Sequence, residues 1–143
     1  MTVKKILSQK GADVVTIEPK ASLSEAVKML AERRIGAVVI TDNQCDVAGI
    51  LSERDIVRAL AQRGPRALEA SVGEVMTRRV VTCKESDTIS SLMEQMTRGK
   101  FRHLPVVEAG RIVGIVSIGD VVKHRLEEME HESNALREYI LTA

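Results

Sequence analysis

The chain carries one sequence segment twice. Residues 47–57 read VAGILSERDIV and residues 112–122 read IVGIVSIGDVV, with glycine, serine and aspartate at the same three places. Upstream positions match at an offset of 66 residues and downstream positions at an offset of 65, so the second hairpin is one residue shorter. The matched upstream pairs include Val15 with Val81, Leu23 with Ile89, Ile35 with Phe101 and Ile40 with Val106. An internal duplication of this period predicts two copies of one folding unit.

The length of the chain limits how each copy can be stabilised. The 143 residues fit one compact domain, whereas a repeat of roughly 60 residues is by itself marginal for burying a core. We therefore expect the two repeats to share a core. We assign residues 1–70 to the first repeat with an N-terminal segment, residues 71–132 to the second repeat, and residues 133–143 to a C-terminal helical tail.

Composition argues against several classes of function. The net charge of +1, from 21 basic and 20 acidic residues, gives no global field that would attract nucleic acid or anionic lipid. Phe101 and Tyr139 are the only aromatic residues, too few for base-stacking platforms. No segment approaches the run of about 18 apolar residues that a membrane span needs, and no secretory apolar region follows Met1. We expect a cytoplasmic protein that binds neither nucleic acid nor membrane.

Hydrophobic periodicity predicts the same order of elements in each repeat: strand, helix, strand, strand, helix. The first repeat is predicted to hold a strand at 14–17, a helix from 22, a hairpin of 37–40 with 47–51, and a helix from 52 that ends at Gly64-Pro65. The second is predicted to hold a strand at 80–83, a helix from 88, a hairpin at 103–116 and a longer final helix. Residues 22–25 and 71–74 have the spacing of capping boxes. We predict an α/β (α+β) fold whose two β-α-β-β-α copies pack about a pseudo-twofold axis and leave two related clefts.

The spacing of apolar residues predicts which face of two helices packs against the rest of the protein. The inward stripe predicted for the last helix of the first repeat consists of Ile56, Val57, Leu60 and Ala61. One flank of the final helix consists of Val121, Val122, Leu126 and Met129. Because charged residues fill its other flank, we expect this helix to pack beyond its own repeat.

The duplicated Gly-x-x-Ser-x-x-Asp segments hold residue types that suit a nucleotide. Ser52 and Ser117 fall at predicted helix starts, where unpaired amides attract phosphate. Asp55 and Asp120, one turn further on, can each accept two donors from a ribose diol. The alternative is ordinary helix capping by the serine, with an acidic residue favoured in the first turn. Duplication does not decide between the two, because a cap would be duplicated too.

The order of elements and the quoted motifs resemble the cystathionine β-synthase (CBS) domain family. The resemblance rests on the paired Gly-x-x-Ser-x-x-Asp segments, on Val75-Met76-Thr77, and on residues 102–107, RHLPVV. It covers the chain from about residue 3 to residue 125. It implies a stand-alone pair of CBS repeats (a Bateman module) with two adenosine-nucleotide clefts that are regulatory and not catalytic.

The resemblance also implies roles for individual residues. The ribose hydroxyls would be held by Asp55 and Asp120, and phosphate would be faced by Ser52 and Ser117. The sugar or base would be contacted by Thr16 and Thr82. The adenine would lie against Ala37 and Val38 in one cleft, or against Leu104 and Pro105 in the other.

The two copies differ beside the predicted clefts. Gly36-Ala37 in the first repeat is replaced by Arg102-His103 in the second, and Arg54 is replaced by Gly119. We therefore predict that the better phosphate-bearing site, which Arg54 reaches across to complete, consists of Asp120, Ser117, Thr82, His103 and Arg102. The first-repeat site is then weaker, or takes another ligand such as the second half of a dinucleotide. The alternatives are a solvated charge for Arg102 and a packed hairpin residue for His103.

No other motif indicates catalysis or metal binding. The sequence lacks a Walker-type loop and a helical His-Glu-x-x-His signature. Cys45 and Cys83 lack the close pairing of a metal knuckle or redox motif. One face of the final helix carries His124, Glu128, His131 and Glu132, a set that a charged helix produces by chance. We predict no catalytic residue and no metal site.

Two hypotheses of function follow. The first is a regulatory module that binds an adenosine nucleotide, AMP foremost with ADP, ATP or NAD(H) as alternatives. Such a module would sense energy or redox state and signal to a separate, unidentified partner protein. The second is a ligand-independent module for homodimerisation and protein interaction. We expect a homodimer in either case, because closed twofold pairing is the commonest oligomer. Enzymatic turnover, such as nucleotide hydrolysis, is a third reading that no motif supports.

Overall fold

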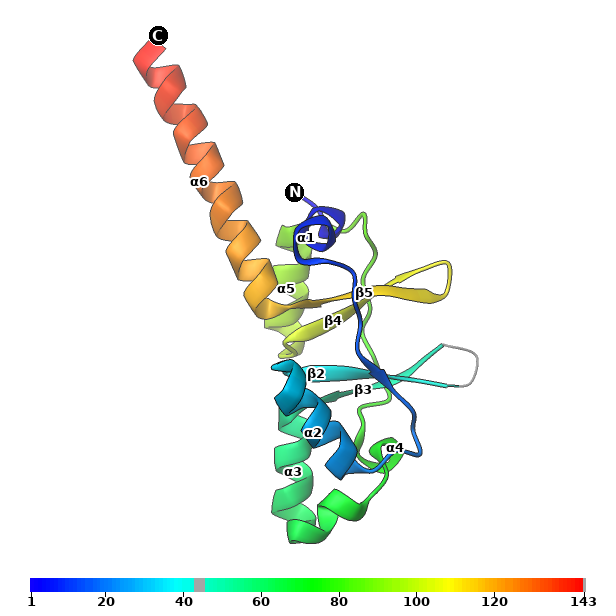
Figure 1. Ribbon diagram of the computed structural model, residues 1–143. Coiled ribbons are helices and arrows are strands. Elements are labelled where there is room, and N and C mark those ends of the chain that lie inside the picture. The colour runs from blue at the N-terminus through cyan, green and yellow to red at the C-terminus, as the bar shows by residue number, and fades with distance from the viewer. Residues whose placement is uncertain (43–45, 143) are drawn as a thin grey trace.

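Each repeat forms its own small sheet, and the two sheets lie one above the other (Figure 1). The structure is a computed structural model that describes residues 1–42 and 46–142. Cys45, one of the two cysteines that lack the pairing of a metal or redox motif, lies outside the described residues. The predicted α/β (α+β) fold of two repeats is confirmed, although some individual elements differ from the prediction.

The first repeat forms the lower half of Figure 1. Its elements are β1 (Thr16–Ile17), α2 (Leu23–Arg33), β2 (Ala37–Thr41), β3 (Val47–Ser52) and α3 (Glu53–Arg63). Strand β1 runs parallel to β2, and β2 runs antiparallel to β3. Helix α2 begins where predicted, because the Ser22 hydroxyl accepts a hydrogen bond from the Glu25 amide at 3.1 Å. The apolar faces of these elements form one buried cluster around Leu51.

The second repeat forms the upper half. Its elements are α5 (Ile89–Gly99), β4 (His103–Glu108), β5 (Arg111–Ser117) and α6 (Ile118–Thr142). Strands β4 and β5 pair antiparallel in a two-stranded sheet. Helix α6 runs through residue 133, so the residues predicted as a C-terminal tail continue the last helix of the repeat.

The prediction of a strand at residues 80–83 is wrong. Only Cys83 pairs there, in a single parallel bridge with Val106. In the first repeat the Val39 amide donates to the Val15 carbonyl at 3.3 Å. The residue that corresponds to Val39 is Pro105, which has no N–H and cannot continue that ladder. The chain before Cys83 therefore separates from β4.

The segment that precedes each repeat packs on the other repeat. Helix α1 (Val3–Lys10), which the sequence analysis did not predict, buries Val3, Ile6 and Leu7 in the second-repeat cluster. The 3-10 helix η1 (Gly64–Glu69) and helix α4 (Val72–Val75) bury apolar residues in the first-repeat cluster. In Figure 1 α1 lies at the top with the second repeat, where it contacts β5 and α6, and α4 lies beside α2 at the bottom. We call α1 and the η1–α4 segment (residues 64–75) the exchanged segments, because each precedes one repeat and packs on the other. They join the two halves of the molecule.

The predicted capping box at residues 71–74 does not form. Ser71 makes no side-chain capping bond to α4. The amides at the start of this one-turn helix are satisfied by backbone instead: Val72 donates to the Ala21 carbonyl at 2.8 Å, and Gly73 donates to the Pro19 carbonyl at 2.9 Å. Backbone carbonyl groups of the first repeat thus take the place of a side-chain cap on α4.

The two predicted apolar stripes are partly wrong. In α3 the buried residues are Ile56 and Ala59, while Val57 is 64% exposed. This helix packs against η1, which covers a narrower flank than the spacing suggested. In α6 the buried residues are Val121 and His124, whereas the predicted packing residues Val122, Leu126 and Met129 are exposed. Helix α6 leaves the body of the molecule after its first turns (Figure 1). Within the described ranges, none of the helices has the combined length and apolar character that crossing a bilayer requires.

Two glycines at equivalent positions allow the exchanged segments to approach β3 and β5. A Cβ atom at Gly49 would lie 2.6 Å from the Met76 sulfur and 2.8 Å from the Thr77 carbonyl oxygen. A Cβ atom at Gly114 would lie 2.7 Å from a methyl carbon of Leu7. Neither space holds a methyl group unless a neighbour moves.

We predict that Gly49→Ala destabilises the protein more than Gly114→Ala. The first change forces a methyl group against backbone that is bonded to β3, at a cost of about 1–3 kcal/mol of unfolding free energy. The second meets the mobile end of Leu7 and should cost less. Urea unfolding followed by circular dichroism measures both. Gly119→Ala, where the nearest atom is 3.6 Å from the new Cβ, is the control and should cost nothing. Equal losses at the two strand glycines would contradict this account.

Candidate functional site

A reciprocal capping box stands at the start of α3 and, in equivalent form, at the start of α6. The Asp55 carboxylate accepts from the Ser52 amide at 2.9 Å, and the Ser52 hydroxyl accepts from the Asp55 amide at 3.4 Å. Asp120 and Ser117 make the same two bonds at 2.9 Å and 3.2 Å. The capping interpretation is therefore confirmed at both helices. The capping box fixes each aspartate carboxylate at the N-terminus of its helix.

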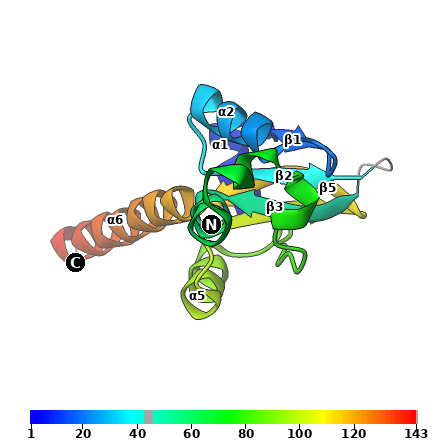
Figure 2. The same ribbon diagram turned by 90° about the horizontal axis from the view of Figure 1, so that it is seen from below.

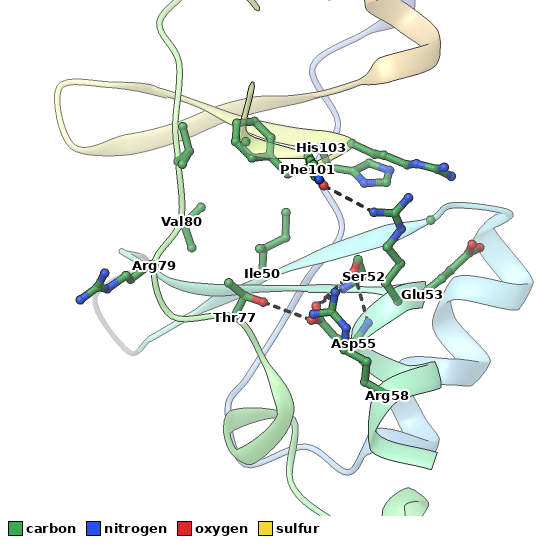
Figure 3. Close-up of a pocket in the computed structure, with 16 residues that line it drawn as sticks. Ile50, Ser52, Glu53, Asp55, Arg58, Thr77, Arg79, Val80, Phe101 and His103 are labelled. Carbon is green, nitrogen blue, oxygen red and sulfur yellow. Dashed lines mark hydrogen bonds between the residues drawn. The ribbon is translucent and has the colours of Figure 1, made fainter. Parts of the chain in front are cut away.

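A cleft of about 510 Å³ opens beside Asp55 (Figure 3), a volume in the range of small-molecule sites. It lies between the two repeats. The residues that line it come from the start of α3, from the connector at residues 77–81, and from the loop between α5 and β4. Ile50 and Val80 stand between Thr77 and Phe101 in the close-up, where they form an apolar wall.

Thr77 positions the connector against the carboxylate. Its hydroxyl donates to Asp55 Oδ1 at 3.1 Å, while Ser52 bonds the other oxygen, Oδ2. Its backbone N–H and C=O pair with Ile50 at 2.9 Å and 3.0 Å. Because a carboxylate has about four acceptor sites, Asp55 retains capacity for a donor from the cleft.

The cleft is electropositive. Its basic side chains are Arg54, Arg58, Arg79, Lys100 and Arg102, and its acidic side chains are Glu53 and Asp55. Five basic groups against two acidic groups leave an excess of three positive charges, although the whole chain carries only +1. A site of this charge favours an anion.

His103 reaches from β4 toward the first repeat. A Cβ atom at Gly36 would lie 3.2 Å from the His103 ring, so the absence of a side chain there makes room for the imidazole. Burial lowers the pKa of His103 below its ordinary value, and the Glu53 carboxylate offsets only part of this effect. The ring is therefore largely neutral at pH 7 and can donate or accept a hydrogen bond.

The structure brings together only some of the residues predicted from sequence. The predicted residues that line the cleft are Ser52, Arg54, Asp55, Arg102 and His103. The predicted residues outside its lining are Thr16, Ala37, Val38, Thr82, Leu104, Pro105, Ser117 and Asp120. The four residues expected to face adenine, namely Ala37, Val38, Leu104 and Pro105, are buried in the two sheets.

The predicted grouping around Asp120 is observed in part, because His103 lies close enough to Asp120 to feel its charge. Arg102 and His103 line the cleft that holds Asp55, although His103 is also paired with Ser117 across the second hairpin. Arg54 does reach the second repeat, where its guanidinium lies 3.4 Å from the Lys100 carbonyl oxygen. It does so within the Asp55 cleft.

Sequence reasoning missed several residues of the cleft. These are Gly36, Ile50, Glu53, Arg58, Thr77, Arg79, Val80, Val81, Gly99, Lys100 and Phe101. A signal for Thr77 was present, because the Val75-Met76-Thr77 motif was noted without a role. The predicted strand at residues 80–83 included Val80 and Val81, and this wrong assignment hid their position at the cleft.

Asp120 is held by a lysine from the exchanged segment α1. Lys10 Nζ lies 2.6 Å from Asp120 Oδ2 and 2.9 Å from the Ile115 carbonyl oxygen. Ile115 and Asp120 correspond to Ile50 and Asp55 at the offset of 65 residues. Lys10 thus bonds the same two groups that Thr77 bonds in the first repeat. Burial alone would raise the pKa of Asp120, but hydrogen bonds from Lys10 and Ser117 outweigh it and lower that pKa.

Comparison with known proteins identifies the family. The sequence pattern described as CBS domain matches residues 3–62 and 72–127. The chain belongs to the CBS domain family. It is a pair of CBS repeats, and CBS pairs are regulatory modules.

Similar structures have been solved. A CBS-domain-containing protein from Agrobacterium tumefaciens is 52% identical, with a TM-score of 0.85 over 87% of this chain and 92% of that one. The CBS domain pair of protein MJ0100, in complex with 5′-methylthioadenosine and S-adenosyl-L-methionine, is 29% identical, with a TM-score of 0.80 over 90% of this chain and 98% of that one.

Similar sequences include longer proteins. A 17.7 kDa protein of Acidianus ambivalens is 34% identical over 80% of this chain. The mitochondrial CBS-domain protein CBSX3 of Arabidopsis thaliana is 33% identical over 81% of this chain. The chain spans 68% of the first and 58% of the second.

Metal ligands do not cluster in the part of the chain that the structure describes. No group of three or more His, Cys, Asp or Glu side chains lies close enough there to hold an ion. Cys83 is a buried free thiol, and burial raises its pKa to about 12.

We predict that Lys10→Met lowers stability in a pH-dependent manner. The depressed pKa of Asp120 contributes stability above its unfolded pKa, near 4, and this contribution is lost as the pH falls through the folded value. The variant should lose about 0.5–1 kcal/mol at pH 7 and less near pH 3. Urea unfolding at both pH values measures this. Lys5→Met, on the exposed face of α1, is the control. A loss that is the same at both pH values would refute the ion pair as its source.

Proposed function

We propose that this chain is a cytoplasmic regulatory module that binds an adenosine nucleotide in the cleft beside Asp55. The observation that carries this proposal is one cleft with a fixed carboxylate, an apolar wall and an excess of basic groups. These three features suit the ribose, the base and the phosphate of one ligand. The adenosine compounds bound to the CBS pair of MJ0100 support the same ligand class.

The proposal assigns each part of the ligand to a part of the cleft. Asp55 Oδ1, which already accepts from Thr77, accepts from one ribose hydroxyl. The adenine lies against Ile50 and Val80, since the cleft offers aliphatic side chains there. The phosphate lies near Arg58, which rises from α3 beside Asp55 in Figure 3.

The charge of the cleft separates the candidate ligands. An excess of three positive charges favours phosphorylated ligands over 5′-methylthioadenosine, which has no phosphate. AMP remains the first candidate from the family resemblance. The number of basic groups also suits ADP, ATP or NAD(H), which would report energy or redox state.

Regulation follows from the position of the cleft between the repeats. A ligand shifts a conformational equilibrium only when it prefers one arrangement. One bound here would contact α3 of the first repeat and the loop before β4 of the second, so its affinity depends on how the repeats are placed. The resulting bias would pass to a separate protein. Binding, and not turnover, is the proposed activity.

The second candidate function is a ligand-independent dimerisation module. The observation that favours it is the set of apolar side chains exposed on α3 and α6, among them Val57 and Leu126. Such a module would keep its partner when the cleft is disabled.

We predict that Asp55→Asn abolishes nucleotide binding and Asp120→Asn does not. Asparagine retains a capping oxygen, but its amide nitrogen replaces the second oxygen and donates, so it cannot accept from the ribose hydroxyl. The native protein at 100 times the dissociation constant gains about 2.7 kcal/mol, or roughly 5–10 °C in Tm for a domain of this size. Differential scanning fluorimetry with AMP, ADP, ATP and NAD(H) measures this shift. Asp120→Asn alters the equivalent capping box and is the matched control. No shift with any nucleotide would defeat the proposed function, whereas loss only in Asp120→Asn would move the site to the other repeat.

We predict that Arg58→Gln weakens binding of a phosphorylated ligand by about tenfold, the loss expected for one hydrogen bond to a charged group. Binding of 5′-methylthioadenosine, which lacks phosphate, should be unchanged. Isothermal titration calorimetry compares the two ligands. Arg66→Gln removes an exposed arginine outside the cleft lining and is the control. Equal weakening of both ligands would show that Arg58 shapes the cleft and does not bind phosphate.

A further inference from the structure

Helix α6 extends well beyond the body that it starts from. Figures 1 and 2 show its C-terminal half projecting away from both sheets. Each residue from 129 to 142 is exposed. An isolated helical segment of this length is marginal in water, because most helical stability in proteins comes from packing. The projecting half of α6 thus lacks, within the described chain, the packing that would stabilise it.

The exposed apolar residues of α6 follow a heptad pattern. The positions are Val122, Leu126, Met129, Ser133, Leu136 and Ile140. They are separated by alternating steps of four and three residues, as the a and d positions of a coiled coil are. Five of the six are apolar, and these five are between 37% and 65% exposed. They form one seam along the helix.

The seam points away from the body to which α6 belongs. The buried residues of α6 are Val121 and His124. At about 100° per residue these two lie on a flank separate from the seam. A second helix can therefore lie along the seam without meeting the sheet on the other flank.

The charges beside the seam match a parallel partner. In a parallel coiled coil each g residue lies near the e residue five positions on in the other helix. These pairs are Arg125 with the partner's Glu130, and Glu132 with the partner's Arg137. Both pairs have opposite charge, and twofold symmetry forms each of them twice. We propose that α6 pairs with α6 of a second copy of this chain as a parallel, in-register coiled coil over residues 122–140.

An antiparallel arrangement fits less well. Antiparallel helices aligned over the full seam would place Lys123 opposite Arg137 and Glu130 opposite its own copy, which are repulsive contacts. Sliding the helices to pair Lys123 with Glu130 would carry Leu136 to Gly119 in the first turn of the partner helix, and Ile140 beyond the start of that helix. Only the parallel register covers the whole seam and pairs opposite charges.

Ser133 limits the strength of the pairing. It is the one polar residue of the seam, and it separates Leu126 and Met129 from Leu136 and Ile140. A polar residue at an a position specifies register at a cost in stability. Fewer than three heptads with such an interruption indicate a dimer whose association depends on concentration.

Sedimentation equilibrium on the full chain tests the pairing in both directions. Leu136→Asp is expected to weaken self-association by at least tenfold, because a charge enters the seam. Ser133→Leu is expected to tighten it by about tenfold, because an apolar residue completes the seam. A tighter reversible equilibrium between monomer and dimer cannot come from failure to fold, which gives larger aggregates. Self-association that neither variant alters, or a monomer at all concentrations including for Ser133→Leu, would overturn the proposal.

A charge exchange tests the parallel register. Glu132→Arg should weaken the dimer by placing like charges together, and adding Arg137→Glu should restore it. In the full antiparallel alignment Glu132 faces its own copy, so Glu132→Arg would not weaken the dimer. In the slid alignment Arg137 lies beyond the start of the partner helix, so Arg137→Glu would not restore it. Either result would overturn the parallel proposal. Glu138→Arg makes the same charge change on the outer side of the helix and is the control. None of these variants alters a residue of the nucleotide cleft, so this test and that of the proposed function fail separately.

Discussion

The close approach of the exchanged segments to two glycines is the contact on which the rest of the structure depends. Gly49 admits the chain at Met76 and Thr77, and Gly114 admits Leu7 of α1. Each approach carries a different residue to an equivalent carboxylate: the Thr77 hydroxyl reaches Asp55, whereas Lys10 reaches Asp120. The two repeats thus offer similar helix starts, yet their carboxylates differ in charge environment.

Capping and ligand binding use different oxygens of Asp55, so the two interpretations of the Ser-x-x-Asp motif are compatible. Oδ2 accepts from Ser52 and closes the capping box, while Oδ1 bonds Thr77 at the edge of the cleft. The cap holds the carboxylate in a fixed position, and a fixed acceptor loses less entropy when it binds. At Asp120 the same cap is present, but the Lys10 ammonium lies on Oδ2 and supplies a neutralising charge.

The duplication made the sheets, the helix starts and five cleft residues predictable, because each copy provided a check on the other. The absence of a strand before Cys83 was not predictable from the duplication. The Val39 amide donates to the strand before it in the first repeat, whereas the equivalent residue of the second repeat, Pro105, has no N–H to donate. Helix α1 was overlooked, although Val3, Ile6 and Leu7 have helical spacing. The grouping of Arg102 with Asp55 was not predicted. It depends on how the two repeats pack through the exchanged segments, and a local sequence pattern does not contain this tertiary arrangement.

The backbone of Arg102 and His103 connects the proposed nucleotide cleft to the proposed pairing helix. The Arg102 side chain lines the cleft, and its carbonyl oxygen accepts from the Ile118 amide, the first of α6, at 2.8 Å. The next residue, His103, also lines the cleft and pairs with Ser117, which caps the same helix. A phosphate that draws Arg102 toward α3 therefore acts on the backbone that sets the direction of α6. If the two copies are joined through α6, a change in that direction alters the spacing of their bodies, and a partner protein can respond to that spacing.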